Sequence, residues 1–420
     1  MAFELIMLIF TLLNGFDTSA PNDHHLIATY VPIAQEQNGY LQLQQAGKKL
    51  VNDETITRVI QDWSGDLASQ VCRQNAEALK YWQLGMKRPA LQVPEVTGFD
   101  TNLTYLSSYR ALARLASIQS RLHAEQGDLK KALDLAMDII GFGSRQQNAN
   151  GSLINHLVGG ACTVIGINRI HQIVHDHPMS IQQLAALDRR LAEITITADG
   201  LKDALRTEYT ISRNVVSTIT SNHLNILNSD IPPILAKILP VMIKKHKTVS
   251  LFAETYGALL ENTNRRVHDR QRIEVKKPGI GSLIRGNFIG ETMHGMLVPA
   301  LNPAIDKIDR TNTDLAFLRV QVAIKGFRTA NNQAWPDTLQ ELVPQWINRL
   351  PEDPFSVPPA PINYSKKKRM LYSVGPDGID NGGATLKQLQ NKGAVVTQWY
   401  GVVDPSIVLD PTLLPKAPIK

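Results

Sequence analysis

The chain has 420 residues, of which 43% are hydrophobic and 20% are charged. These fractions are ordinary for a folded globular protein, so they exclude bulk disorder and low complexity, and the length suits one large domain or two ordinary ones. The net charge of +6 is spread along the chain and clusters only at Lys366–Arg369, whereas nucleic-acid-binding surfaces concentrate positive charge and place aromatic residues within it.

The first residues, Met1–Phe16, are largely apolar, but this run is shorter than the about 20 residues that comfortably cross a membrane. The small residues of Asp17–Pro21 follow, as they do in a signal peptide, although Glu4 is acidic and no Lys or Arg precedes the run. Three interpretations stay open: an atypical export signal, the end of a longer membrane anchor, or a buried first helix. We therefore treat residues 1–20 as a separate signal-like or anchor-derived segment.

Helical periodicity dominates the next part of the chain. After an entry loop over residues 21–39, apolar residues recur at spacings of three and four, which is the period of an amphipathic helix. The pattern predicts helices over residues 53–87, 105–122, 129–141, 152–175, 180–194, 201–227, 249–266 and 313–330. We expect a helical domain over residues 21–310.

The clearest part of this pattern is a pair of helices joined at Gln126–Asp128. Glycine at Gly127 ends one helix, and Asp128 can cap the next. Ala132 and Ala136 are small enough to let two antiparallel helices approach closely. The pair resembles one hairpin of the tetratricopeptide type, but we find no repeat at a fixed period. The sequence therefore predicts an irregular helical-hairpin array rather than a regular solenoid.

The pattern changes after Trp335–Pro336, where proline and glycine become frequent and strand-like fragments replace long helices. Short elements are expected at residues 337–343, 362–364 and 370–374. We place a domain boundary near residue 310 and assign the helix over residues 313–330 to a C-terminal α+β domain over residues 311–420.

Several motifs follow one another in this C-terminal part. They are Ala323–Arg328, Trp335–Pro336, Leu339–Pro344, Leu350–Phe355, Ile362–Tyr364 and Leu371–Gly378. In this order and spacing, over residues 313–383, they resemble the soluble half of a type II secretion major pseudopilin. The resemblance implies a helix, a proline-anchored loop with a short helix, a small antiparallel sheet and a Gly/Asp loop that binds calcium. The whole chain also looks like uncharacterised bacterial envelope proteins with a helical-hairpin N-terminal region.

Asp377, Asp380 and Asn381 are the calcium ligands that this resemblance implies, because calcium prefers hard oxygen donors. The family continues past its glycines with closely spaced aspartates that complete the ion site, whereas Ala384–Lys387 follows here. An alternative explanation needs no ion, since Asp and Asn side chains in such a loop form Asx-turns with their own backbone.

Elsewhere the sequence contains no motif that points to catalysis. His171 and His175 have a spacing that zinc sites use, but a histidine near a helix C-terminus also interacts favourably with the helix dipole. Cys72 and Cys162 lie in an apolar helical pattern, without a CxxC or zinc spacing, as buried free cysteines do. We therefore assign no catalytic and no cofactor-binding residues.

Together these observations predict a mainly α protein in which an irregular helical-hairpin array precedes a small α+β pseudopilin-like domain. We expect a non-enzymatic binding or structural protein of the cell envelope, exported or membrane-associated, with a protein partner there and no nucleic-acid partner. Its N-terminus is a candidate membrane tether. Two alternatives stay open: an enzyme whose site is assembled from distant residues, and a cytosolic regulatory protein in which Met1–Phe16 is a buried helix.

Overall fold

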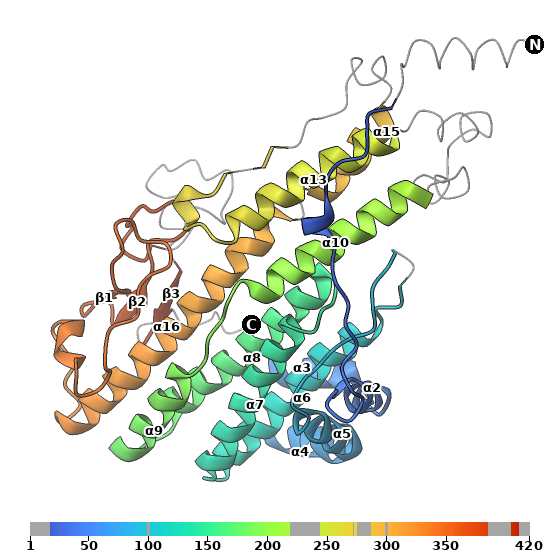
Figure 1. Ribbon diagram of the computed structural model, residues 1–420. Helices are drawn as coiled ribbons and strands as arrows, with labels where there is room; N and C mark the ends of the chain where they lie inside the picture. Colours follow the sequence, from blue (N-terminus) through green and yellow to red (C-terminus); the bar gives the residue numbers. More distant parts are fainter. Residues whose placement is uncertain are drawn as a thin grey trace, which may run out of the picture.

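The computed structural model describes residues 17–98, 101–218, 244–271, 273–274, 287–298, 301–384 and 405–410. Long helices run through most of the molecule, and a small sheet lies beside one of them, α16 (Asn302–Ala330) (Figure 1). Within these ranges the protein is mainly helical and has one three-stranded antiparallel sheet, as the sequence predicts. The apolar segment Met1–Phe16 lies outside the described residues, so its three interpretations remain predictions.

Short helices form the N-terminal part of the fold. They are η1 (His24–Leu26), α2 (Tyr40–Lys48), α3 (Asp53–Gln61), α4 (Gly65–Gln74) and α5 (Ala76–Met86). The helical stretch predicted over residues 53–87 is therefore divided into three helices. One division lies at Ser64, whose side chain accepts a hydrogen bond from Leu67 N and starts α4. The next lies at the buried Asn75, whose amide bonds both the N–H and the carbonyl of Val51.

The predicted hairpin is present in the structure. It consists of α6 (Tyr105–Glu125) and α7 (Leu129–Gln147). Gly127 has a φ of +84°, and the Asp128 side chain accepts a hydrogen bond from Lys131 N, so the stop and the restart are where the sequence places them. Ala132 and Ala136 are fully buried. The likeness of this hairpin to tetratricopeptide repeats stays a prediction.

Helix α8 (Leu153–Asp176) lies against α7 with little space between the two backbones. A Cβ atom on Gly143 of α7 would lie 2.4 Å from the backbone nitrogen of Thr163 on α8. Only glycine fits at this position. The thiol of Cys162 on α8 is fully buried, and it lies 3.8 Å from the Tyr109 carbonyl oxygen of α6. Both cysteines are free, and burial raises the pKa of Cys162 to about 12 and that of Cys72 to about 11.

A second group of helices continues the array. It contains α9 (Ile181–Ala192), α10 (Asp199–Thr218), α13 (Lys245–Asn262), η3 (Val267–Asp269) and α15 (Phe288–Leu297). Ser180 and Gln183 form a capping box at the start of α9. Buried aromatic rings join α10 to α13, with the Tyr209 and Tyr256 ring centroids 5.7 Å apart. The predicted helix over residues 201–227 is described only as far as Thr218.

Helix α16 is the element that joins the two parts of the fold. It begins at Asn302 rather than at residue 313, with proline in its first turn, and it continues without interruption to Ala330. The domain boundary expected near residue 310 therefore falls inside one continuous helix. Its side chains enter three cores. Ile305 and Ile308 pack with α10 and α13. Further along the helix, Leu315, Leu318 and Val322 pack with α8 and α9, whereas Phe317, Val320 and Ile324 pack under the sheet.

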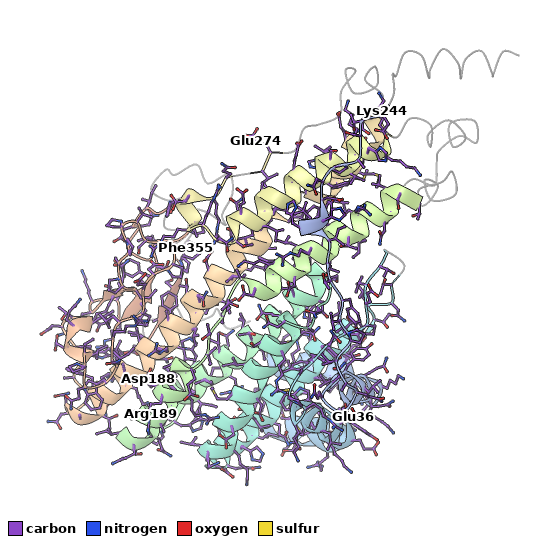
Figure 2. The ribbon with its side chains drawn as sticks, viewed as in Figure 1. Glu36, Asp188, Arg189, Lys244, Glu274 and Phe355 are labelled. Atoms are coloured by element: carbon purple, nitrogen blue, oxygen red, sulfur yellow. The ribbon has the colours of Figure 1, made fainter. Side chains whose placement is uncertain are left out.

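An ion pair adds to the contact between α16 and α9. The Arg319 Nε atom lies 3.1 Å from the Asp188 carboxylate, and both side chains are largely buried. Figure 2 labels Asp188 on α9, on the side that faces α16. The C-terminal half of α16 is thus fixed to the helical part of the chain by apolar packing and by a shielded charge pair.

The residues after α16 form what we call the C-terminal module, residues 331–384 and 405–410. It contains η5 (Leu339–Leu342), β1 (Asn363–Ser365), β2 (Met370–Tyr372) and β3 (Ser406–Val408). The strands have the order β1-β2-β3 and are antiparallel, with Leu371 opposite both Tyr364 and Ile407. Leu371 is fully buried against α16. The short helix predicted over residues 337–343 is a 3-10 helix, capped by Thr338 and Glu341.

Candidate functional site

The turn before the sheet is organised by a buried carboxylate. Asp353 is 1% exposed, and its Oδ1 accepts hydrogen bonds from Phe355 N at 3.0 Å and from the Ser373 hydroxyl at 2.8 Å. Its Oδ2 accepts a third from Val374 N at 2.9 Å. One side chain therefore fixes the Leu350–Phe355 turn to the end of β2, where the Gly/Asp loop begins.

The sequence analysis identified the Leu350–Phe355 motif but missed the role of Asp353. The available signal was an acidic residue directly before Pro354 and Phe355, in a position that becomes buried once Phe355 enters the core. Figure 2 shows Phe355 at the edge of the module that faces η3. There a ring nitrogen of His268 lies 2.8 Å from the Phe355 carbonyl oxygen, so the helical part of the chain also supports this turn.

The predicted calcium ligands lie in the Gly/Asp loop, which follows Val374, the last residue that Asp353 contacts. Asp377 Oδ1 accepts a hydrogen bond from Ile379 N at 3.1 Å, and Asp380 Oδ1 accepts one from Gly382 N at 2.7 Å. The Asn381 amide donates to the Ile379 carbonyl at 3.1 Å. The two aspartate bonds each accept from the N–H two residues further on, which is the geometry of an Asx-turn. The loop therefore uses its acidic side chains to hold its own backbone.

The cationic cluster folds back onto the module. Lys366 forms an ion pair with Asp337, and Arg369 forms one with Asp410. The Lys368 ammonium lies 2.5 Å from the Gly382 carbonyl oxygen of the Gly/Asp loop. A side-chain cation thus contacts a backbone carbonyl oxygen of this loop.

These contacts bear on the expected calcium site. Calcium takes six to eight oxygen ligands. In the part of the chain that the structure describes, no three His, Cys, Asp or Glu side chains come close enough to hold a metal ion. Asp410 is turned toward Arg369, and Asp404 lies outside the described residues. The Asx-turn alternative accounts for the positions of Asp377 and Asp380, and calcium binding stays a prediction.

The histidines with zinc-like spacing have separate partners. His171 is buried, and its ring contacts the Gln321 side chain on α16. Burial lowers the pKa of His171 to about 4. His175 Nδ1 instead lies 2.6 Å from the carboxylate of Asp176. The structure does not bring the two imidazole rings to one metal site, and His171 serves as a neutral packing residue between α8 and α16.

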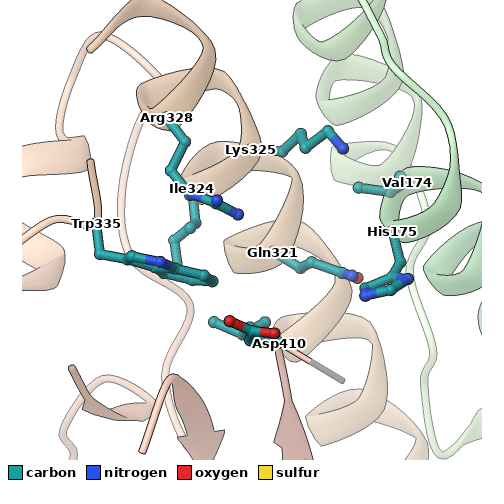
Figure 3. A pocket seen from close by; sticks show the side chains of 9 residues that line it. Val174, His175, Gln321, Ile324, Lys325, Arg328, Trp335 and Asp410 are labelled. Carbon is teal, nitrogen blue, oxygen red and sulfur yellow. The ribbon is translucent and has the colours of Figure 1, made fainter. Parts of the chain in front are cut away.

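A cavity of about 250 Å³ lies where α8, α16 and the residues after β3 meet. Its polar wall is formed by His175, Gln321, Lys325, Arg328, Trp335 and Asp410 (Figure 3). The Arg328 guanidinium lies over the Trp335 ring, 4.0 Å from its centroid. Sequence analysis did not find this site, because its residues come from three segments that are distant along the chain.

Among the described helices, α8 alone has the length and hydropathy of a membrane span. More than half of that apolar window, 56%, is buried inside the protein, and a core helix of a folded domain has the same properties. Its buried residues include the ionisable Arg169 and His156, which are costly in lipid, and His156 Nδ1 lies 3.2 Å from the Gln147 carbonyl oxygen of α7. We interpret α8 as a core helix.

Comparison with known proteins finds no relative. No protein-family model matches the chain, and no match is found among curated proteins or among solved structures. The resemblance of residues 313–383 to pseudopilins therefore stays a prediction, and the function has to be argued from the residues themselves.

Proposed function

We propose that this chain is a non-enzymatic binding or structural protein of the cell envelope, in which the helical part serves as a scaffold for a pseudopilin-like module. The order of elements after α16 supports the proposal. A proline-flanked short helix, η5, precedes the turn at Leu350–Phe355, and an antiparallel hairpin then leads into a Gly/Asp loop. That is the order that the resemblance implies.

The observation that carries the proposal is the shared use of α16. Leu315, Leu318 and Val322 are buried against α8 and α9, and full burial of each such side chain stabilises a fold by about 1.5–3 kcal/mol. Separation of the module and its helix from the scaffold would expose all three, so it would cost several kcal/mol. The scaffold therefore holds the module in one orientation, as a structural or docking component requires.

The buried ionisable groups support a structural role over a catalytic one. Asp353 is engaged by three donors of its own module, and His171 is engaged by Gln321. Asp314 has a pKa raised to about 6 by burial, and it pairs with Arg310 on the same helix. Each group has a local packing or hydrogen-bonding role, so none needs a substrate to explain its position.

For the Gly/Asp loop we propose the role of a partner-facing surface that needs no ion. Ile379 at its tip is 60% exposed, and Val357 on the neighbouring turn is 62% exposed. Asp353 joins these two segments, because it bonds both Phe355 N and Val374 N. Two exposed aliphatic side chains on segments fixed to each other are suited to contact a protein partner.

The location is tested by cell fractionation of the full chain with a tag at either end, in a bacterial host. We expect the C-terminal tag in the membrane or periplasmic fraction. The N-terminal apolar segment should either be removed with its tag or keep the protein with the membrane. A retained N-terminal tag on a soluble cytosolic protein would contradict the proposal and would favour the cytosolic regulator.

The partner surface is tested separately, with a photo-crosslinking amino acid placed at Ile379 in cells. Position Ile181, which is 40% exposed on α9, is the matched control. We expect one discrete adduct from position 379 and none from position 181. Equal labelling from the two positions would show that the loop has no specific partner.

A further inference from the structure

The cavity between α8, α16 and the residues after β3 has an unequal charge distribution. Two acidic groups lie near it, and each already has a cationic or imidazole partner. Asp410 forms an ion pair with Arg369, and Asp176 bonds the His175 ring at 2.6 Å. The acids of the cavity are thus engaged by groups other than the two cations of α16, Lys325 and Arg328.

Lys325 and Arg328 are three residues apart on α16, so they project from the same side of the helix. Arg328 is held over Trp335, and its Nε donates to the Gln333 carbonyl at 3.3 Å. The Lys325 ammonium makes no hydrogen bond or ion pair with any residue within the described ranges. Figure 3 shows both side chains at the cavity wall, with Asp410 below them.

The surroundings make this pair of cations unfavourable without a counter-ion. Burial lowers the pKa of Lys325, and the neighbouring Arg328 lowers it further, while Asp176 acts in the opposite direction. Burial also lowers the pKa of Arg328, which Asp410 partly offsets. An anion between the two groups would relieve both the repulsion and the loss of solvation.

We propose that this cavity binds a compact organic anion, with its carboxylate or phosphate on Lys325 and Arg328 and its apolar part against Trp335. The volume of about 250 Å³ is slightly below the usual range for ligand pockets, so the ligand is small. Ile324 and Leu409 supply the apolar remainder of the wall. This site is independent of the proposed envelope role.

Isothermal titration of the full chain tests the proposal, with benzoate and phenyl phosphate as probes at constant ionic strength. Benzamide, which has the same ring without the charge, is the control ligand. We expect at least one anion to bind with one-to-one stoichiometry, and benzamide not to bind. The relative affinity of the two anions identifies whether the natural ligand carries a carboxylate or a phosphate.

Variants assign the binding to this cavity. Lys325→Met should weaken the preferred anion about tenfold or more, whereas Lys325→Arg should retain binding. Lys307→Met, an exposed position on the same helix, should have no effect. Asp410→Asn should tighten binding because it removes a repulsive charge, a result that damage to the fold cannot produce. The proposal is overturned if neither anion binds, or if Lys325→Met and Lys307→Met weaken binding equally.

Discussion

Asp353→Asn tests how the module is held together. The substitution preserves shape, but it converts one acceptor oxygen into an NH2 group. Whichever oxygen is replaced, at least one of the donors at Phe355 N, Ser373 Oγ and Val374 N loses its acceptor and faces another donor. A hydrogen bond to a charged group contributes about 1.5–3 kcal/mol, and the site is buried, so we expect a loss of about 2–3 kcal/mol in unfolding free energy.

The assay is urea denaturation of the full chain, together with hydrogen exchange of the peptide that contains β2. Exchange at Leu371 should accelerate in Asp353→Asn, because the variant loosens the end of its strand. Asp377→Asn is the matched control, since asparagine also forms the Asx-turn that Asp377 makes with Ile379 N. It should change stability by less than about 0.5 kcal/mol. Equal effects of the two variants would refute the reasoning.

Three further outcomes follow from the structure. Gly143→Ala should destabilise the protein by about 1–3 kcal/mol, because the added Cβ would lie 2.4 Å from Thr163 N. Gly257→Ala is the control and should not destabilise it, because a Cβ there meets nothing within 4 Å. Equal shifts in melting temperature for the two variants would contradict the close packing of α7 on α8. Burial lowers the pKa of His171 from 6.5 to about 4, so this side chain is protonated more readily in the unfolded chain than in the fold. The free energy of unfolding should therefore fall by about 3 kcal/mol between pH 6.5 and pH 4. Denaturant titrations of His171→Gln should lack this pH-dependent component. Millimolar calcium should leave the melting temperature unchanged, because the oxygen atoms of Asp377 and Gly382 in the Gly/Asp loop already accept hydrogen bonds from Ile379 N and Lys368. A rise in melting temperature that Asp377→Ala abolishes would instead support calcium binding by this loop.

Most of the fold that the sequence predicts follows from patterns within short segments of the chain. The stop at Gly127 and the cap at Asp128 lie within one short segment, and both keep their roles in the structure. The strands β1 and β2 adjoin each other across a short turn, so their pairing also needed only nearby residues.

What the sequence did not predict depends on contacts between distant residues. The pairing of β3 with β2 and the burial of Asp353 arise only after the chain has folded back on itself. Helices α2 and α15 were not predicted, because each is short and its apolar side chains cover only a few turns. The start of α16 was placed too late, since Leu301 and Ile305 pack against α10 and α13 rather than against the module.

The most direct test of the account is labelling of Lys367→Cys with a membrane-impermeant maleimide in intact cells. Lys367 is exposed at the tip of the module, and the native thiols are slow to react because their pKa values are raised. An envelope protein should be labelled before lysis, once the outer membrane is permeabilised. Labelling that occurs only after the cytoplasmic membrane is broken would contradict the envelope role.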